Sequence, residues 1–131
     1  MVRTLLTVLV LTLLPTPVFA EWTWVSQNVD GTTFYVDFER IRKHDGYVYY
    51  WELTDLLKPS KYGHLSSKVY IQGDCELFRF KYLSFVHHKQ PMGQGSAISE
   101  YNYTPKNPEW IYPTPTSADE INLKRVCAYV K

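Results

Sequence analysis

The stretch "GDCELFRFKYLSF", residues 73–85, contains one of the two cysteines of this chain. After Cys75, aromatic and basic residues alternate in the pattern typical of a β-strand with one apolar face. The only other cysteine, Cys127, lies four residues from the C-terminus. Only one other cysteine, at the far end of the chain, is therefore available to pair with Cys75.

Residues 1–20, "MVRTLLTVLVLTLLPTPVFA", have the layout of a secretory signal peptide. Arg3 precedes an apolar run from Leu5 to Leu14, which is too short to span a bilayer. We therefore expect cleavage before Glu21 and export of a mature domain, residues 21–131. No cysteine follows the expected cleavage site, so we expect neither a lipid anchor nor a transmembrane segment.

Export favours a disulfide between Cys75 and Cys127, because paired cysteines oxidise outside the cytoplasm. The two residues are 52 positions apart, and closing such a loop stabilises the fold by about 4 kcal/mol in the chain-entropy model. A metal pair or a reactive thiol is the alternative. Neither has the C-x-x-C or Cys/His spacing that it needs here.

The composition of the mature chain gives it no net charge that would attract a highly charged partner to the molecule as a whole. Once Arg3 is removed, 13 of the 14 basic residues remain and balance 13 acidic ones, so nothing favours nucleic acid or an anionic membrane. Aromatic content is high, with 11 tyrosines and 4 tryptophans. Such residues suit half-buried sheet surfaces and also interfaces, including that of a homodimer, and composition leaves both uses open.

Apolar patterning predicts an α+β fold, with about six antiparallel strands and one C-terminal helix tethered to the sheet by the disulfide. Ser117 and Glu120 form a capping-box pattern for the helix start. The helix has one apolar stripe, made of Leu123, Val126, Cys127 and Val130. The strands are expected near residues 22–25, 34–36, 47–56, 65–72, 75–89 and 96–103.

Two details of this layout are further expectations. Residues 38–46, "FERIRKHDG", are expected to form a short helical or irregular turn whose amides Asp37 caps. In the strand at 47–56, the face of Tyr47, Tyr49, Trp51 and Leu53 is apolar and mostly aromatic, and we expect it to be the core beneath the helix. Its use as an exposed interface is the alternative.

Several stretches together resemble the surface-adhesin protein E-like family of Gram-negative bacteria. They are an early Trp24, "YVDFERIRK", "YWELTDL", "KPSKYGHLSSKVYIQGDCELFRF", "MGQG" and "TPTSADEINLKRVCAYV". The resemblance implies an antiparallel sheet with a C-terminal helix held by a Cys75–Cys127 disulfide. It also implies adhesion to host extracellular-matrix proteins such as vitronectin or laminin, although the family's founding type carries a lipid-anchoring cysteine that this chain lacks.

The strongest candidate binding surface is a group of basic residues beside an aromatic one. Such a group can engage an acidic protein segment or a sulfated glycan. The alternative is a solvated loop and a charged strand that merely blocks aggregation. The candidate residues are Lys58, Lys61, Tyr62 and Lys68, with Arg79 and Lys81 as an extension.

Other motifs favour ordinary structural roles. The four histidines, residues 44, 64, 87 and 88, are expected at the surface rather than around a metal. "MGQG" predicts a tight turn with positive φ at Gly93 or Gly95, rather than an anion cradle. No nucleophile–base arrangement is evident, so we expect no enzyme and no cofactor.

The sequence therefore predicts an exported, non-enzymatic binding protein that engages a protein partner. It would reside in the periplasm, or be secreted or displayed at the surface of a Gram-negative bacterium. The alternative is a periplasmic structural or accessory protein of the envelope with no host ligand. A small-molecule carrier would require a concave pocket.

Overall fold

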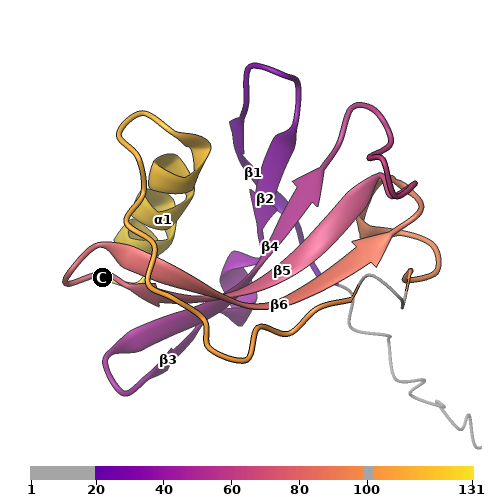
Figure 1. Ribbon diagram of the computed structural model, residues 1–131. Helices are drawn as coiled ribbons and strands as arrows, with labels where there is room; N and C mark the ends of the chain where they lie inside the picture. Colours follow the sequence, from indigo (N-terminus) through magenta and orange to yellow (C-terminus); the bar gives the residue numbers. More distant parts are fainter. Residues whose placement is uncertain (1–19, 99–101) are drawn as a thin grey trace, which may run out of the picture.

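The computed structural model describes residues 20–98 and 102–131, and there the chain forms one curved antiparallel sheet with a helix against it (Figure 1). The sheet order is β1-β2-β4-β5-β6, and β3 pairs with β4. The strands are β1 (Thr23–Gln27), β2 (Thr33–Val36), β3 (Arg42–His44), β4 (Tyr47–Asp55), β5 (Ser66–Asp74) and β6 (Arg79–His88). Two 3-10 turns, η1 (Phe38–Arg40) and η2 (Pro91–Gly93), and one α-helix, α1 (Ala118–Tyr129), complete the described part.

One edge of β4 is shared by two short strands. β2 pairs with Glu52–Asp55, and β3 pairs with Tyr47–Tyr49. The turn η1 lies between them, so residues 38–46 combine the expected turn with a short strand that periodicity did not reveal. The pairing of β2 with β4 continues up to η1, because the Asp37 amide donates to the Trp51 carbonyl at 3.3 Å.

Asp37 does not cap η1 as predicted. Its side chain accepts no capping hydrogen bond. Its carboxylate is buried instead, and Oδ2 lies 3.5 Å from Nη1 of Arg40. Burial raises the pKa of Asp37, and the Arg40 charge opposes that rise.

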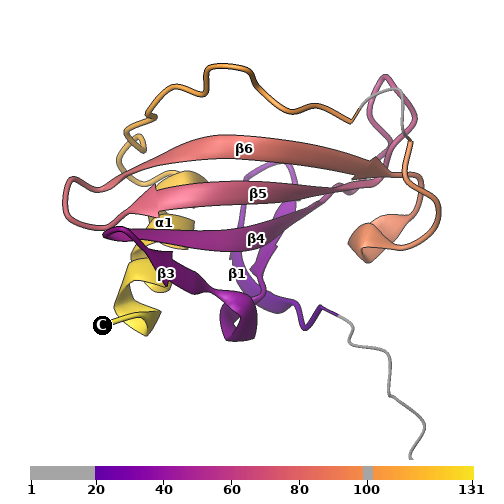
Figure 2. The same ribbon diagram turned by 90° about the horizontal axis from the view of Figure 1, so that it is seen from below.

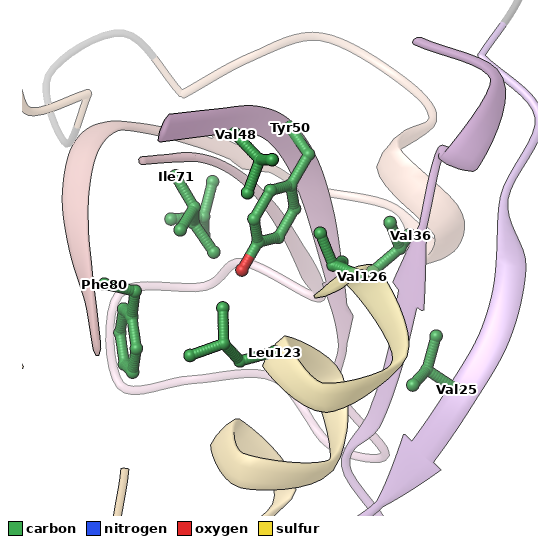
Figure 3. Close-up of a cluster of buried hydrophobic side chains, with 9 residues drawn as sticks. Val25, Val36, Val48, Tyr50, Ile71, Phe80, Leu123 and Val126 are labelled. Carbon is green, nitrogen blue, oxygen red and sulfur yellow. The ribbon is translucent and has the colours of Figure 1, made fainter. Parts of the chain in front are cut away.

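The helix α1 covers one face of the sheet, which we call the helix face. Its side chains include Val48 and Tyr50 of β4 and Ile71 of β5, and Leu123 and Val126 of α1 pack onto them (Figure 3). The predicted start of α1 is confirmed, because the Ser117 hydroxyl accepts from the Glu120 amide at 3.2 Å. The predicted apolar stripe of the helix faces the core, because Leu123 and Val126 are part of the buried cluster and Cys127 and Val130 pack against it.

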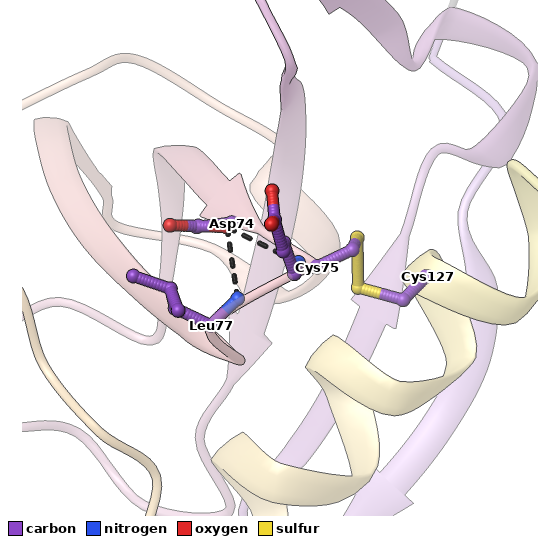
Figure 4. Close-up of a disulfide and its surroundings, with 5 residues drawn as sticks. Asp74, Cys75, Leu77 and Cys127 are labelled. Carbon is purple, nitrogen blue, oxygen red and sulfur yellow. Dashed lines mark hydrogen bonds between the residues drawn. A yellow bond between two sulfur atoms is a disulfide. The ribbon is translucent and has the colours of Figure 1, made fainter.

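The disulfide joins α1 to the turn between β5 and β6 (Figure 4). Cys75 and Cys127 have their Cα atoms 5.6 Å apart. Cys75 begins the turn rather than the strand, because β6 starts only at Arg79. Asp74 orders this turn, since its Oδ1 accepts from the amides of Glu76 and Leu77, both at 3.1 Å. The predicted fold class, with its tethered helix, is confirmed.

The aromatic side chains of β4 lie on the opposite face of the sheet, which we call the outer face. Alternation along β4 places Val48 and Tyr50 under the helix, so Tyr47, Tyr49 and Trp51 point away from it and are half-buried. The prediction that they form the core beneath α1 is therefore wrong. They pack instead against neighbours on their own face: Trp51 lies 4.9 Å from Tyr70, Tyr49 lies 6.3 Å from Tyr70, and Tyr47 lies 5.4 Å from Trp110, measured between ring centroids.

The segment after β6 runs back along the edge of that strand that does not pair with β5 (Figure 2). Isolated bridges join Phe85 to Tyr103 and Phe80 to Ile111. In the range of the predicted strand 96–103, the described residues form only such bridges, and 99–101 lie outside the described part. Residues 1–19, the body of the expected signal peptide, also lie outside it. Across residues 20–98 and 102–131, no helix is long and apolar enough to cross a bilayer.

Candidate functional site

The loop between β4 and β5, residues 56–65, carries most of the predicted binding residues. We call it the cationic loop, because Lys58 and Lys61 lie in it and it contains no acidic residue. Both lysines are exposed, and half of the Tyr62 surface is exposed. The Lys61 ammonium lies 4.9 Å from the Tyr62 ring centroid, so the two side chains present a cation and an aromatic surface together.

Hydrogen bonds within the cationic loop hold its backbone in place. At its base the Leu56 amide donates to the Leu65 carbonyl at 2.8 Å. At its tip the Ser60 amide donates to the His64 carbonyl at 2.9 Å, and the Ser60 hydroxyl lies 2.8 Å from Nδ1 of His64. The loop can therefore present its exposed lysines without first becoming ordered, which lowers the entropy cost of binding.

Lys68 lies nearby on β5, but it is partly used in packing. It is half-buried on the outer face, opposite Leu53. Its stem lies against η2, where a Cβ added to Gly93 would come within 2.8 Å of the Lys68 Cε atom. The structure therefore brings three of the four candidates together in the loop, with Lys68 beside the loop base.

The predicted turn "MGQG" is confirmed, with positive φ at both Gly93 and Gly95. Its amides serve the fold: Met92 donates to Asp55 Oδ1 at 2.7 Å, and Gly93 donates to the Ser66 hydroxyl at 2.8 Å. These two amides are committed to protein acceptors, so they do not form an anion cradle.

The predicted extension to Arg79 and Lys81 is wrong. Both residues begin β6, at the end of the sheet far from the cationic loop, and the length of β5 separates the two ends by about 26 Å. Arg79 is paired with Asp74 at 2.8 Å. Arg79 and Lys81 also lie 4.0 and 4.3 Å from the ring centroid of Trp110, so they hold the returning segment against the sheet.

The histidines are less exposed than predicted. His44 is exposed, but His64 and His87 are half-buried and His88 is buried. His64 and His87 stack with ring centroids 4.4 Å apart, and burial lowers the pKa of both. No group of three or more metal-binding side chains occurs in the described ranges.

A buried polar cluster lies between β4 and α1, and sequence patterning missed it. Glu52 projects from the helix face among apolar residues, close to Asn122 and Asp119 of α1. Burial raises the pKa of Glu52 to about 8, helped by the Asp119 charge and opposed by the Asn122 amide. The Ser26 hydroxyl donates to the Asn122 side-chain oxygen at 2.6 Å. The signal that the sequence offered was Glu52 itself, an acidic residue on a mixed strand face with Val48, Tyr50 and Thr54.

Known protein families and solved structures show similarity to this chain over most of its length. A family model described as surface-adhesin protein E matches residues 22–128. No curated protein matches the chain. Solved structures of Haemophilus influenzae protein E share the fold. One crystal form has 20% identity, a TM-score of 0.62, and coverage of 89% of this chain and 95% of that one. A second structure has 19% identity, a TM-score of 0.59, and coverage of 87% and 89%.

Proposed function

This chain belongs to the surface-adhesin protein E family, and on that premise we propose that it is an exported, non-enzymatic binding protein that engages a protein partner through its cationic loop. The observation that carries the proposal is the exposure of Lys58, Lys61 and Tyr62 on one ordered loop without an acidic neighbour in it. Lys68 extends this surface along β5.

The chemistry of the loop favours an acidic protein segment as the ligand. Two exposed ammonium groups attract carboxylates over several ångströms, and Tyr62 supplies contact area at low entropy cost. In the described ranges, no ion pair occupies Lys58 or Lys61. Vitronectin and laminin, the host proteins that the family resemblance implies, are the first partners to test.

The test is surface plasmon resonance of the mature domain on immobilised vitronectin and laminin at two salt concentrations. We expect salt-sensitive binding, and we expect Lys58→Glu combined with Lys61→Glu to weaken it about tenfold. Lys43→Glu combined with Lys124→Glu is the matched control, because it reverses the same number of exposed lysines elsewhere. Equal affinities for the loop variant and the unmodified domain would remove the cationic loop from the binding surface.

Localisation is tested separately in intact cells. We propose that residues 1–20 direct export and that the mature domain reaches the cell surface. Protease added to intact cells should then degrade the mature domain without cell lysis. Full protection until the outer membrane is opened would instead place it in the periplasm, as the accessory-protein alternative requires.

A further inference from the structure

A cleft of about 630 Å³ opens beside the disulfide, at the opposite end of β4 from the cationic loop. Clefts of 300–1,000 Å³ are typical of small-molecule sites. One side is lined by Val48 of β4 and Phe78 of the β5–β6 turn, and the other by Ala128 and Val130 at the end of α1. The disulfide, which joins the turn to α1 (Figure 4), also lines the cleft, through Cys75 and Cys127. The inner surface is therefore mostly apolar.

The wall residue Phe78 is held in an unusual backbone conformation. Its φ is +53°, in the left-handed region that bulky side chains rarely adopt. The turn keeps this conformation, because Asp74 accepts from two turn amides and also binds Arg79. A glycine would relieve the backbone strain, but it would lack the ring that packs against the core and lines the cleft.

The rim of the cleft is cationic. Lys43 of β3, Lys124 of α1 and Lys131 all line it. Asp45 is the only acidic side chain among the lining residues, and its carboxylate lies 3.1 Å from Nε2 of His44. An apolar wall beneath several ammonium groups complements a ligand with an apolar body and an anionic head.

We propose that this cleft binds an amphiphilic anion, with a linear acyl chain against the apolar wall and its carboxylate beside Lys43 and Lys124. The inference goes beyond the proposed function, because the ligand is a small molecule and the surface is not the cationic loop. Tyr47 at the cleft and Asp55 at the loop are the two ends of β4, about 26 Å apart. The two sites can therefore be altered independently.

The experiment is isothermal titration calorimetry of the oxidised mature domain with dodecanoate, kept below its micelle-forming concentration. Two probes dissect the ligand: dodecyltrimethylammonium has the same tail with a cationic head, and butyrate has the same head with almost no tail. We expect saturable binding of dodecanoate. Both other probes should bind with an affinity that is lower by about tenfold or more. Absence of saturable dodecanoate binding would overturn the proposal, and so would equal affinity for the cationic probe.

Two variants test whether the ligand binds in the cleft. Lys43→Glu combined with Lys124→Glu should weaken dodecanoate binding about tenfold, because the rim then repels the head group. Ala128→Trp, at an exposed position of the wall, should fill the cleft and abolish binding. The loop variant that carries glutamate at positions 58 and 61 is the control and should bind dodecanoate normally. Undiminished binding by both cleft variants, with unchanged circular dichroism, would show that the ligand lies elsewhere.

Discussion

Replacing Glu52 by glutamine tests how the protein accommodates a carboxyl group in its core. Burial and the Asp119 charge raise the pKa of Glu52 from 4.5 to about 8, so the folded protein holds this proton more tightly than the unfolded chain does. The contribution of Glu52 to the free energy of unfolding therefore falls as pH rises from about 4.5 to about 8, and is constant on either side of that window.

The magnitude follows from the size of this shift. Each pKa unit corresponds to about 1.4 kcal/mol, so the unmodified protein should lose about 5 kcal/mol of stability from Glu52 across the window. Glutamine has nearly the same shape as the protonated carboxyl and can donate a hydrogen bond, but it does not ionise. Glu52→Gln should therefore gain stability relative to the unmodified protein as pH rises, by about 5 kcal/mol in total.

The assay is urea unfolding of both oxidised proteins at pH 5, 7 and 9. Groups that do not interact with Glu52, such as His64 and His87, titrate equally in both proteins and cancel in the difference. Glu39→Gln, at an exposed position of η1, is the control and should change stability by less than about 0.5 kcal/mol at every pH. A difference between Glu52→Gln and the unmodified protein that stays constant from pH 5 to pH 9 would refute the reasoning, because Glu52 would then be ionised in the fold.

Three further predictions concern other parts of the fold. Cys127→Ser should lower the free energy of unfolding by about 4 kcal/mol, and thermal melting indistinguishable from that of the oxidised parent would contradict the role of the disulfide. Gly93→Ala should destabilise the protein by more than about 1 kcal/mol, because φ is +68° and the new Cβ would meet the Lys68 stem; unchanged urea unfolding would argue against this close packing. Burial lowers the pKa of His64 and His87, so the folded protein favours the neutral form of both side chains. The free energy of unfolding should therefore fall as pH falls from their unfolded pKa near 6.5 towards their lower folded pKa values. Histidine NMR titrations that show unshifted pKa values would disprove this prediction.

Local patterns predicted much of the architecture because they depend on short-range chemistry. The Ser117 cap and the apolar stripe of α1 need only the geometry of one helix, and both are present. The disulfide followed from the presence of only two cysteines in a chain expected to be exported. The sequence also placed Lys58 and Lys61 in one loop, because the expected strands end at residue 56 and resume at residue 65.

Other features depended on contacts between distant segments. Alternation along β4 defined two faces but could not say which one the helix covers, and the more aromatic face proved to be the outer one. The packing of α1 decided it: Asn122 and the apolar stripe of the helix meet Glu52 and Tyr50, while Trp110 covers part of the other face.

The sequence by itself determined most of the strands, the C-terminal helix, the cysteine pair and the charged loop, because each depends on residues close together in the chain or on simple counting. Only the tertiary structure decided the covered face, the separation of Arg79 from the cationic loop and the existence of the cleft. The physical reason is that each of these features depends on how segments distant in the chain pack together, and no periodicity within a single segment encodes that packing.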